Sequence, residues 1–312
     1  MAPHDLAVPG TQDYDSIECR ELSGVNMNRR EFLFSSSLAV LGLTCTSCRS
    51  GSASANPKSN RQRIAFNTAN LVGRVSGYRY ELRNWGEQHR KTIAATDERA
   101  WDSICGDIAA AGYRAVEIWE AHAAPESLNA NKAKTWRRIL EDHGLRPVAY
   151  AGGLRPETIQ VCQWLGIPHV DGSLRGQTPE EATALCRASG IAFNLENHPE
   201  KTVEEILKPI GGGNQWLGVC VDTGWLGTQG ASSPAIIKAL DGLVRHTHIK
   251  DVQRAGTHET CRLGDGVVNI PAALEALREI NYQGWYSWED EPEDRNPFDL
   301  ARWTLNYLQS RV

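Results

Sequence analysis

Residues 192–222 read AFNLENHPEKTVEEILKPIGGGNQWLGVCVD and contain the pattern that decides the fold. Short apolar runs at 192–196 and 217–222 flank an amphipathic segment at 202–209. Apolar runs of this length predict buried strands, and the amphipathic segment between them predicts a helix. We therefore expect one strand–helix–strand unit in this stretch.

The same alternation extends from Ile64 almost to the end of the chain. Strands are predicted at 64–67, 115–118, 147–151, 169–171, 192–196, 217–222, 244–250 and 285–289. Helices are predicted at about 97–111, 129–143, 156–165, 179–189, 202–209, 233–241, 270–280 and 297–310. Strict alternation predicts an α/β fold, a closed (β/α)8 TIM barrel in a single domain. The alternative is an open doubly wound sheet, but no glycine-rich phosphate turn follows the first strand.

Two details of the pattern make specific predictions. The helix at 97–111 is expected to begin after an N-cap at Thr96 and to end before Gly112. The connections 68–95 and 251–269 are unusually long for loops. Loops of that length are usually functional, and in a barrel both would lie at the C-terminal face of the strands, where active sites are built.

The N-terminal region has the three parts of an export signal. Asn28-Arg29-Arg30-Glu31-Phe32-Leu33 places an arginine pair before an apolar run that ends at Leu43. That run is shorter than the roughly 20 residues needed to span a bilayer, and Ala53-Ser54-Ala55 resembles a signal-peptidase site. We predict a twin-arginine signal within residues 1–55, a polar leader at 56–63 and the barrel at 64–312.

This signal predicts a periplasmic or otherwise exported protein. Translation is expected to begin at Met27 rather than Met1, because residues 1–26 are polar and patternless. Lipoprotein anchoring at Cys45 or Cys48 is the alternative, but the residues before each cysteine fit a lipobox poorly. Cleavage after Ala55 would leave 257 residues, the size of one barrel.

The composition excludes several classes of protein. With 33 Lys and Arg against 38 Asp and Glu, the formal net charge is −5, so no basic excess is present to bind nucleic acid. After the expected cleavage site the cysteines are odd in number and lack CxxC spacing, so a disulfide scaffold is not expected. We expect no stable membrane span; homo-oligomeric assembly is left open.

The last four predicted strands each end in a residue that can bind a metal ion. Glu196, Asp222, His248 and Glu289 follow these strands, and the first two intervals are both 26 residues. In a closed barrel the four strand ends converge. Three carboxylates and one imidazole suit one divalent ion, Mn²⁺ first, with Mg²⁺, Co²⁺ and Zn²⁺ as alternatives.

Several motifs resemble those of the xylose isomerase-like TIM barrels, the sugar-phosphate isomerase/epimerase superfamily. They are Leu195-Glu196-Asn197-His198, Val221-Asp222-Thr223-Gly224, His246-x-His248-x-Lys250-Asp251, Leu263-Gly264-Asp265-Gly266 and Gly284-Trp285-Tyr286-Ser287-Trp288-Glu289. The resemblance covers about residues 64–310. It implies that Glu196, Asp222, His248 and Glu289 are metal ligands, and that the two glutamates also transfer protons to and from the substrate.

The resemblance also suggests residues that contact substrate. Glu117 matches a position that often meets substrate hydroxyls, with a structural hydrogen bond as the alternative. His198 is expected to orient Glu196, and Lys250 to hold a substrate oxygen or pair with a carboxylate. The acidic run at 290–294 is expected to be a solvated face.

Trp225 departs from the family pattern, because many relatives have histidine three residues after the aspartate. This argues against a multi-zinc nuclease and weakens the case for a ketose epimerase. Trp225 is expected to offer a stacking surface for a sugar ring or to pack beneath a loop.

The expected activity is a metal-dependent isomerase or epimerase acting on a free keto-sugar or cyclitol by proton abstraction next to a carbonyl. One alternative is a lyase or dehydratase that carries out β-elimination on a keto-sugar, inosose or 3-keto-glycoside. Another is a non-catalytic sugar-binding barrel. In each case the partner is a small carbohydrate.

Overall fold

The computed structural model describes residues 63–312. The predicted export signal, its cleavage site and the start of the polar leader lie outside the described residues. Export through the twin-arginine route therefore stays a prediction.

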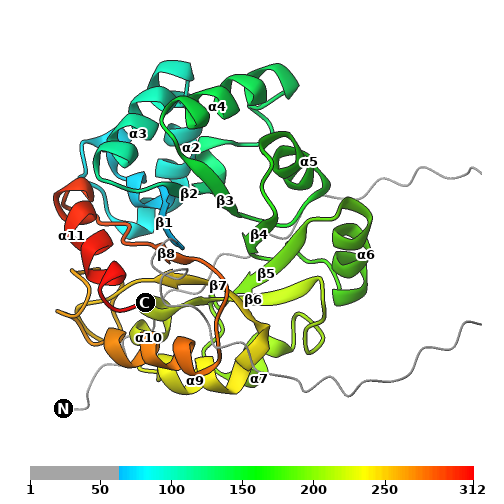
Figure 1. Ribbon diagram of the computed structural model, residues 1–312, viewed down its shortest axis with the longest axis vertical. Coiled ribbons are helices and arrows are strands. Elements are labelled where there is room, and N and C mark those ends of the chain that lie inside the picture. Colours follow the sequence, from blue (N-terminus) through cyan, green and yellow to red (C-terminus); the bar gives the residue numbers. More distant parts are fainter. Residues whose placement is uncertain (1–62) are drawn as a thin grey trace, which may run out of the picture. The chain divides into compact units, whose positions relative to one another are not determined.

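Eight parallel strands close into one barrel in sequence order (Figure 1). Strands β1 and β8 pair directly, with Phe66 opposite Trp288 in the register. This confirms the predicted TIM barrel. The strands are β1 (Ile64–Asn67), β2 (Ala115–Trp119), β3 (Arg146–Ala151), β4 (His169–Gly172), β5 (Ala192–Glu196), β6 (Leu217–Asp222), β7 (Val244–Ile249) and β8 (Tyr286–Trp288).

Helices follow the strands and lie around the outside of the barrel (Figure 1). They are α3 (Glu98–Ala110), α4 (Ala130–Asp142), α5 (Pro156–Leu165), α6 (Pro179–Ser189), α7 (Val203–Leu207), α9 (Ser233–Leu240), α10 (Ile270–Glu279) and α11 (Phe298–Gln309). Local sequence signals explain where several of these helices begin. Capping boxes open α6 at Thr178 and α7 at Thr202, and proline occupies the first turn of α5, α6, α9 and α10.

The connection 68–95 is not the long loop that the sequence predicted. It contains helix α2 (Trp85–Ala95) and three 3₁₀ turns, η1 (Thr68–Leu71), η2 (Arg74–Ser76) and η3 (Leu82–Asn84). The predicted N-cap at Thr96 is also wrong. Asp97 caps α3 by accepting the Ala100 N–H, whereas the Thr96 hydroxyl donates to the Thr92 carbonyl of α2. Thr96 therefore closes the preceding helix instead of opening the next.

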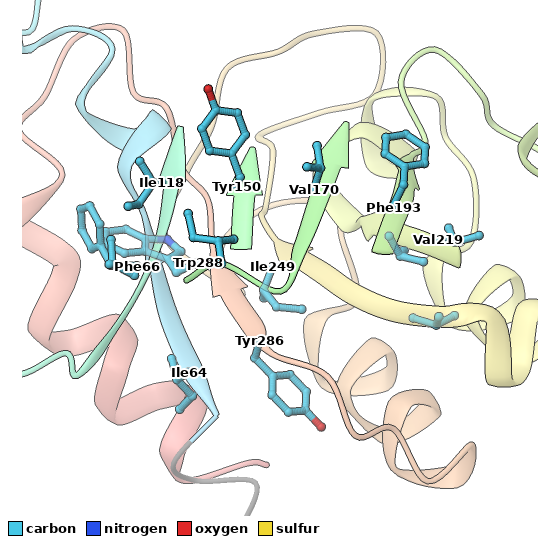
Figure 2. Packing of buried hydrophobic residues seen from close by; sticks show 14 of the residues in the cluster. Ile64, Phe66, Ile118, Tyr150, Val170, Phe193, Val219, Ile249, Tyr286 and Trp288 are labelled. Carbon is cyan, nitrogen blue, oxygen red and sulfur yellow. The ribbon is translucent and has the colours of Figure 1, made fainter. Parts of the chain in front are cut away.

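Alternation along the strands separates an apolar outer face from a polar interior. In β1 and β8 the residues Phe66 and Trp288 belong to the main hydrophobic core, and the Phe66 ring stacks on Phe298 of α11 at 5.4 Å. Figure 2 shows the outward side chains of several strands. Burying each of these large side chains stabilises the fold by about 1.5–3 kcal/mol. The intervening residues point inward, because successive strand residues face opposite sides.

His122 is a buried histidine between the outer helices and the barrel. Its Nδ1 lies 3.0 Å from the Thr68 hydroxyl, whose oxygen already accepts the Trp119 N–H. The hydroxyl proton is thus free to be donated to a neutral Nδ1. Burial lowers the pKa of His122 to about 3, helped by the positive charge of Arg74.

This histidine should make the fold sensitive to acid. The pKa in the unfolded chain is about 6.5, so between pH 6.5 and 3 only the unfolded state binds the proton, and stability is lost as the pH falls. From pH 7 to pH 5 the loss due to His122 should be about 2 kcal/mol in the free energy of unfolding. Urea unfolding at pH 7 and pH 5 should show that the free energy of unfolding of His122→Asn falls by about 2 kcal/mol less than that of wild type. His143→Asn, at a partly exposed histidine, is the control. Its loss of stability between pH 7 and pH 5 should stay closer to that of wild type.

Candidate metal centre and active-site cavity

The barrel brings the four predicted ligands to one point. Oxygen or nitrogen atoms of Glu196, Asp222, His248 and Glu289 all lie within 4.8 Å of one another. Hard cations bind their ligands at about 2.0–2.6 Å, so opposite ligands of one ion lie up to about 5 Å apart. The donor set and its spacing therefore fit one divalent ion. All but Glu196 are buried.

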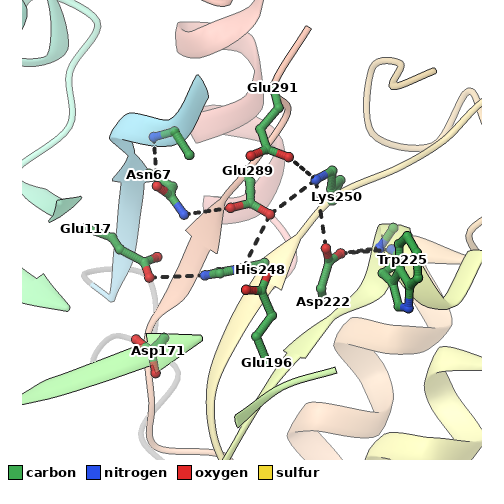
Figure 3. Close-up of polar contacts among 12 residues, drawn as sticks. Asn67, Glu117, Asp171, Glu196, Asp222, Trp225, His248, Lys250, Glu289 and Glu291 are labelled. Carbon is green, nitrogen blue, oxygen red and sulfur yellow. Dashed lines mark hydrogen bonds and ion pairs between the residues drawn. The ribbon is translucent and has the colours of Figure 1, made fainter. Parts of the chain in front are cut away.

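His248 lies at the floor of this cluster, 1% exposed. Its Nδ1 is 3.0 Å from Oε1 of Glu196 and 3.3 Å from Oε2 of Glu289 (Figure 3). Its Nε2 points the other way and lies 3.1 Å from Oε1 of Glu117. Burial opposes charge on the ring, but Cys220 and then the carboxylates of Glu289, Glu117 and Glu196 raise the pKa of His248 well above its usual value. The nitrogen that faces the other ligands is thus Nδ1.

The carboxylate of Glu289 is held by a neutral amide and by an ammonium group. The Asn67 amide donates to Oε1 at 2.8 Å, and the Lys250 ammonium lies 3.3 Å from Oε2. Asn67 is itself fixed, because its Oδ1 accepts the Ala69 N–H at the start of η1. Glu289 therefore projects in a defined direction.

Asp222 is positioned by the turn that follows β6. One oxygen accepts the N–H groups of Gly224 and Trp225, which begins the short helix α8 (Thr223–Thr228). The Asn197 side chain also bonds both the N–H and the carbonyl of Asp222. The second oxygen of Asp222 lies 3.8 Å from Lys250 and remains on the cluster side.

Glu291 is a site residue that the sequence did not predict. The acidic run was expected to be solvated, yet Glu291 pairs with Lys250 at the wall of the cavity, and Asp290 is buried against Arg295. Burial and the nearby Glu289 raise the pKa of Glu291 to about 8, against the opposing effect of Lys250. The same carboxylates raise the pKa of Lys250, although burial alone would lower it. No local pattern distinguishes this residue from Asp294, the exposed residue of the same run.

Above the cluster lies a cavity of about 570 Å³. Its wall includes six of the predicted site residues, Glu196, His198, Asp222, Trp225, Lys250 and Glu289. The wall also includes Trp119 and Arg175, and it contains side chains that were not predicted, among them Leu82, Trp85, Ser173, His258, Thr260 and Glu293. This volume falls within the range of small-molecule sites.

Glu117 is placed differently from the prediction. Its side chain is 0% exposed and lies beneath His248, outside the residues that line the cavity. The other histidine of β7, His246, also contacts Glu117, with its Nε2 at 3.0 Å from Oε2. The two imidazoles hold the pKa of Glu117 well below its usual range despite burial. The structural hydrogen-bond role is therefore the one observed.

Trp225 and His198 form part of one aromatic wall. The Trp225 ring stacks on His258 with 5.1 Å between ring centroids, and the His198 ring lies nearly perpendicular to it with 3.9 Å between centroids. His198 was expected to orient Glu196, but among the described residues its ring has no hydrogen bond to that carboxylate.

His258 comes from the long connection 251–269, which is held in place by Asp251. That carboxylate accepts the N–H groups of Val252, Gly264, Gly266 and Val268.

The fold and the strand-end cluster define a TIM barrel with a carboxylate–histidine cluster at its C-terminal face that can hold a metal ion. The sequence profile of the family described as xylose isomerase-like TIM barrel matches residues 105–311. This chain belongs to that family.

Several curated relatives with significant similarity are named inosose dehydratases. That of Mesomycoplasma hyopneumoniae strain J is 29% identical over 117 residues, covering 31% of this chain and 39% of the relative. That of Lacticaseibacillus casei is 27% identical over 109 residues, covering 29% and 37%. The alignments thus span about two fifths of the length of these relatives.

Solved structures show the same fold at low identity. A probable 3-DHS dehydratase of Bacillus anthracis has a TM-score of 0.59 at 14% identity, covering 80% of this chain and all of the other. An L-ribulose 3-epimerase has a TM-score of 0.58 at 16% identity, covering 79% and 93%. The IolI protein with a bound zinc atom has a TM-score of 0.55 at 18% identity, covering 79% and 96%.

Within residues 63–312 no helix is long and apolar enough to cross a membrane.

Charge removal at Asp222 should weaken metal binding without unfolding α8. Asparagine caps helices as well as aspartate does, so Asp222→Asn keeps the N-cap and loses only the anionic ligand. A cation that binds only the folded protein adds about 4 kcal/mol of stability at 1,000 times its Kd. Thermal unfolding with Mn²⁺ should show this gain in wild type and in Asp102→Asn, an exposed control, but little of it in Asp222→Asn. Equal stabilisation of both variants would remove Asp222 from the centre.

Proposed function

We propose that the protein is a metal-dependent enzyme that removes a proton next to the carbonyl of a keto-sugar or cyclitol. The observation that carries this proposal is the pair of glutamates, Glu196 and Glu289, whose carboxylates approach the His248 ring from different strands at the floor of a sugar-sized cavity (Figure 3). The names of the curated relatives support a carbohydrate substrate.

Glu196, Asp222, Nδ1 of His248 and Glu289 would hold the divalent ion. Three carboxylates and an imidazole favour Mn²⁺, with Mg²⁺, Co²⁺ and Zn²⁺ as alternatives. When bound, such an ion polarises a carbonyl and stabilises the charge that develops as the neighbouring C–H bond breaks.

The glutamates then act as a proton acceptor and a proton donor. Glu289 is suited to one of these roles because Asn67 and Lys250 hold its orientation and balance its charge. Lys250 has a second use. Its ammonium lies between Glu289 and Glu291 at the cavity wall, where it would donate a hydrogen bond to a substrate oxygen. The aromatic faces of Trp119 and Trp225 would pack against the apolar faces of a sugar ring.

Dehydration is the favoured outcome. One carboxylate takes the proton from the carbon next to the carbonyl, and that electron pair forms a C=C bond. The hydroxyl on the following carbon accepts a proton from the second acid and leaves as water. The inosose dehydratase names of the relatives favour this route, as does Trp225 in place of the histidine that ketose epimerases carry.

Epimerisation is the second candidate and begins with the same proton abstraction. The approach of Glu196 and Glu289 to His248 from separate strands favours it, since one carboxylate would remove the proton and the other would return one to the opposite face.

Reactions in D₂O separate the two routes. Candidate inososes and keto-sugars are incubated with the Mn²⁺-loaded protein and followed by mass spectrometry and NMR. Dehydration should release a product lighter by one water, whereas epimerisation should incorporate deuterium and retain all the oxygens. A panel in which no compound loses water or exchanges its proton would contradict proton abstraction.

Replacing either glutamate should lower kcat far more than it weakens substrate binding. Loss of a positioned acid or base costs about 100- to 10,000-fold in kcat, so Glu196→Gln and Glu289→Gln should fall in this range at saturating Mn²⁺. Metal content measured on the same samples separates loss of the ion from loss of proton transfer. Glu204→Gln, at an exposed position on α7, is the matched control and should retain wild-type kcat. Unchanged turnover in both site variants would show that the two glutamates are not the proton acceptor and donor.

A further inference from the structure

A column of buried carboxylates and imidazoles runs through the barrel interior beneath the metal centre. It begins with His248 at the floor of the cavity and continues through Glu117 on β2, His246 on β7 and Asp171 on β4. Strands β1 and β8 separate β2 from β7, so these contacts cross the interior rather than following a strand pair.

The column ends at the opposite side of the barrel. Asp171 accepts hydrogen bonds from Nδ1 of His169 at 3.0 Å and from the Asn194 amide at 2.7 Å. His169 is the first residue of β4, and its side chain is 14% exposed. The cavity lies at the other ends of the strands. Side chains thus connect the metal centre to the far end of the barrel.

Glu117 has a constrained role in this column. As a carboxylate it can only accept hydrogen bonds. Oε1 accepts from His248 and Oε2 from His246, so both rings must carry their proton on Nε2. When a cation displaces the proton from Nδ1, the proton retained on Nε2 leaves the lone pair of His248 on Nδ1, which is the atom that faces Glu196 and Glu289.

We infer that Glu117 is a positioning residue that selects the tautomer and orientation of His248 and thereby sets the affinity of the metal centre. His246 supports this role, because its Nε2 bond keeps Glu117 between the two rings. Asp171 lies further away, with 3.8 Å between Oδ2 and Nε2 of His246. This inference rests on the metal centre proposed above.

Glu117→Gln tests the inference. Glutamine has one acceptor oxygen and no charge, so it cannot accept from both Nε2–H groups. Loss of such an outer partner typically costs 10- to 100-fold in metal affinity. Isothermal titration with Mn²⁺ should therefore show that increase in Kd, and the visible spectrum of the Co²⁺-loaded variant should shift. Asp171→Asn should raise the Kd less.

Glu120→Gln is the matched control. Glu120 is a buried carboxylate three residues along the chain, but it bonds Gly153, Arg155 and Arg175 and no residue of the column. Its variant should bind Mn²⁺ within about twofold of wild type. A Glu117→Gln variant with wild-type Kd and Co²⁺ spectrum would overturn the inference. Wild-type protein that binds no metal would overturn the proposed metal centre itself.

A measurement on wild type covers the case in which Glu117→Gln does not fold. In the Zn²⁺-loaded protein, ¹⁵N–¹H correlations of the histidine rings identify which nitrogen carries the proton. For His248 we expect a slowly exchanging proton on Nε2. A proton on Nδ1 would overturn the inference.

Discussion

The floor of the cavity depends on one buried interaction, the pair of hydrogen bonds that Glu117 accepts from His246 and His248. An unpaired carboxylate in the barrel interior would cost several kcal/mol, and two imidazole donors remove most of that cost. The same pairing leaves Nδ1 of His248 facing the other ligands. Stability and site geometry therefore have a common cause, because the contacts that make the charge tolerable also orient the ring.

Closure of the sheet makes this interior possible. Strands β1 and β8 carry outward apolar side chains, Phe66 and Trp288, and their ends direct the polar side chains of Asn67 and Glu289 inward. The outer helices bury the apolar set and supply most of the stabilisation. The barrel axis is then free to hold ionisable groups, which at the strand ends lie close enough to share one cation. Clustered carboxylates at this point repel one another unless positively charged partners lie beside them. Lys250 is one such partner.

Segments outside the regular βα units build the rest of the site. The connection 68–95 folds into η1, η3 and α2 and adds Leu82 and Trp85 to the cavity wall. The connection 251–269 contributes His258 and Thr260 and is fixed by the four N–H groups bound to Asp251. These elements lie at the end of the barrel where the ligand residues converge. They determine the shape of the space that a substrate would occupy.

The amino-acid sequence by itself determined the barrel and the positions of the ligands along it. Both follow from local patterns, since strands and amphipathic helices alternate along the chain and each strand end is identifiable. Only the tertiary structure decided that Glu117 lies beneath His248, that Glu291 pairs with Lys250, and that His258 stacks on Trp225. Those contacts join residues far apart in the chain, and no local pattern records them. They arise because closing the barrel brings nonadjacent strands and their connections into one small volume, where each charge must find a partner.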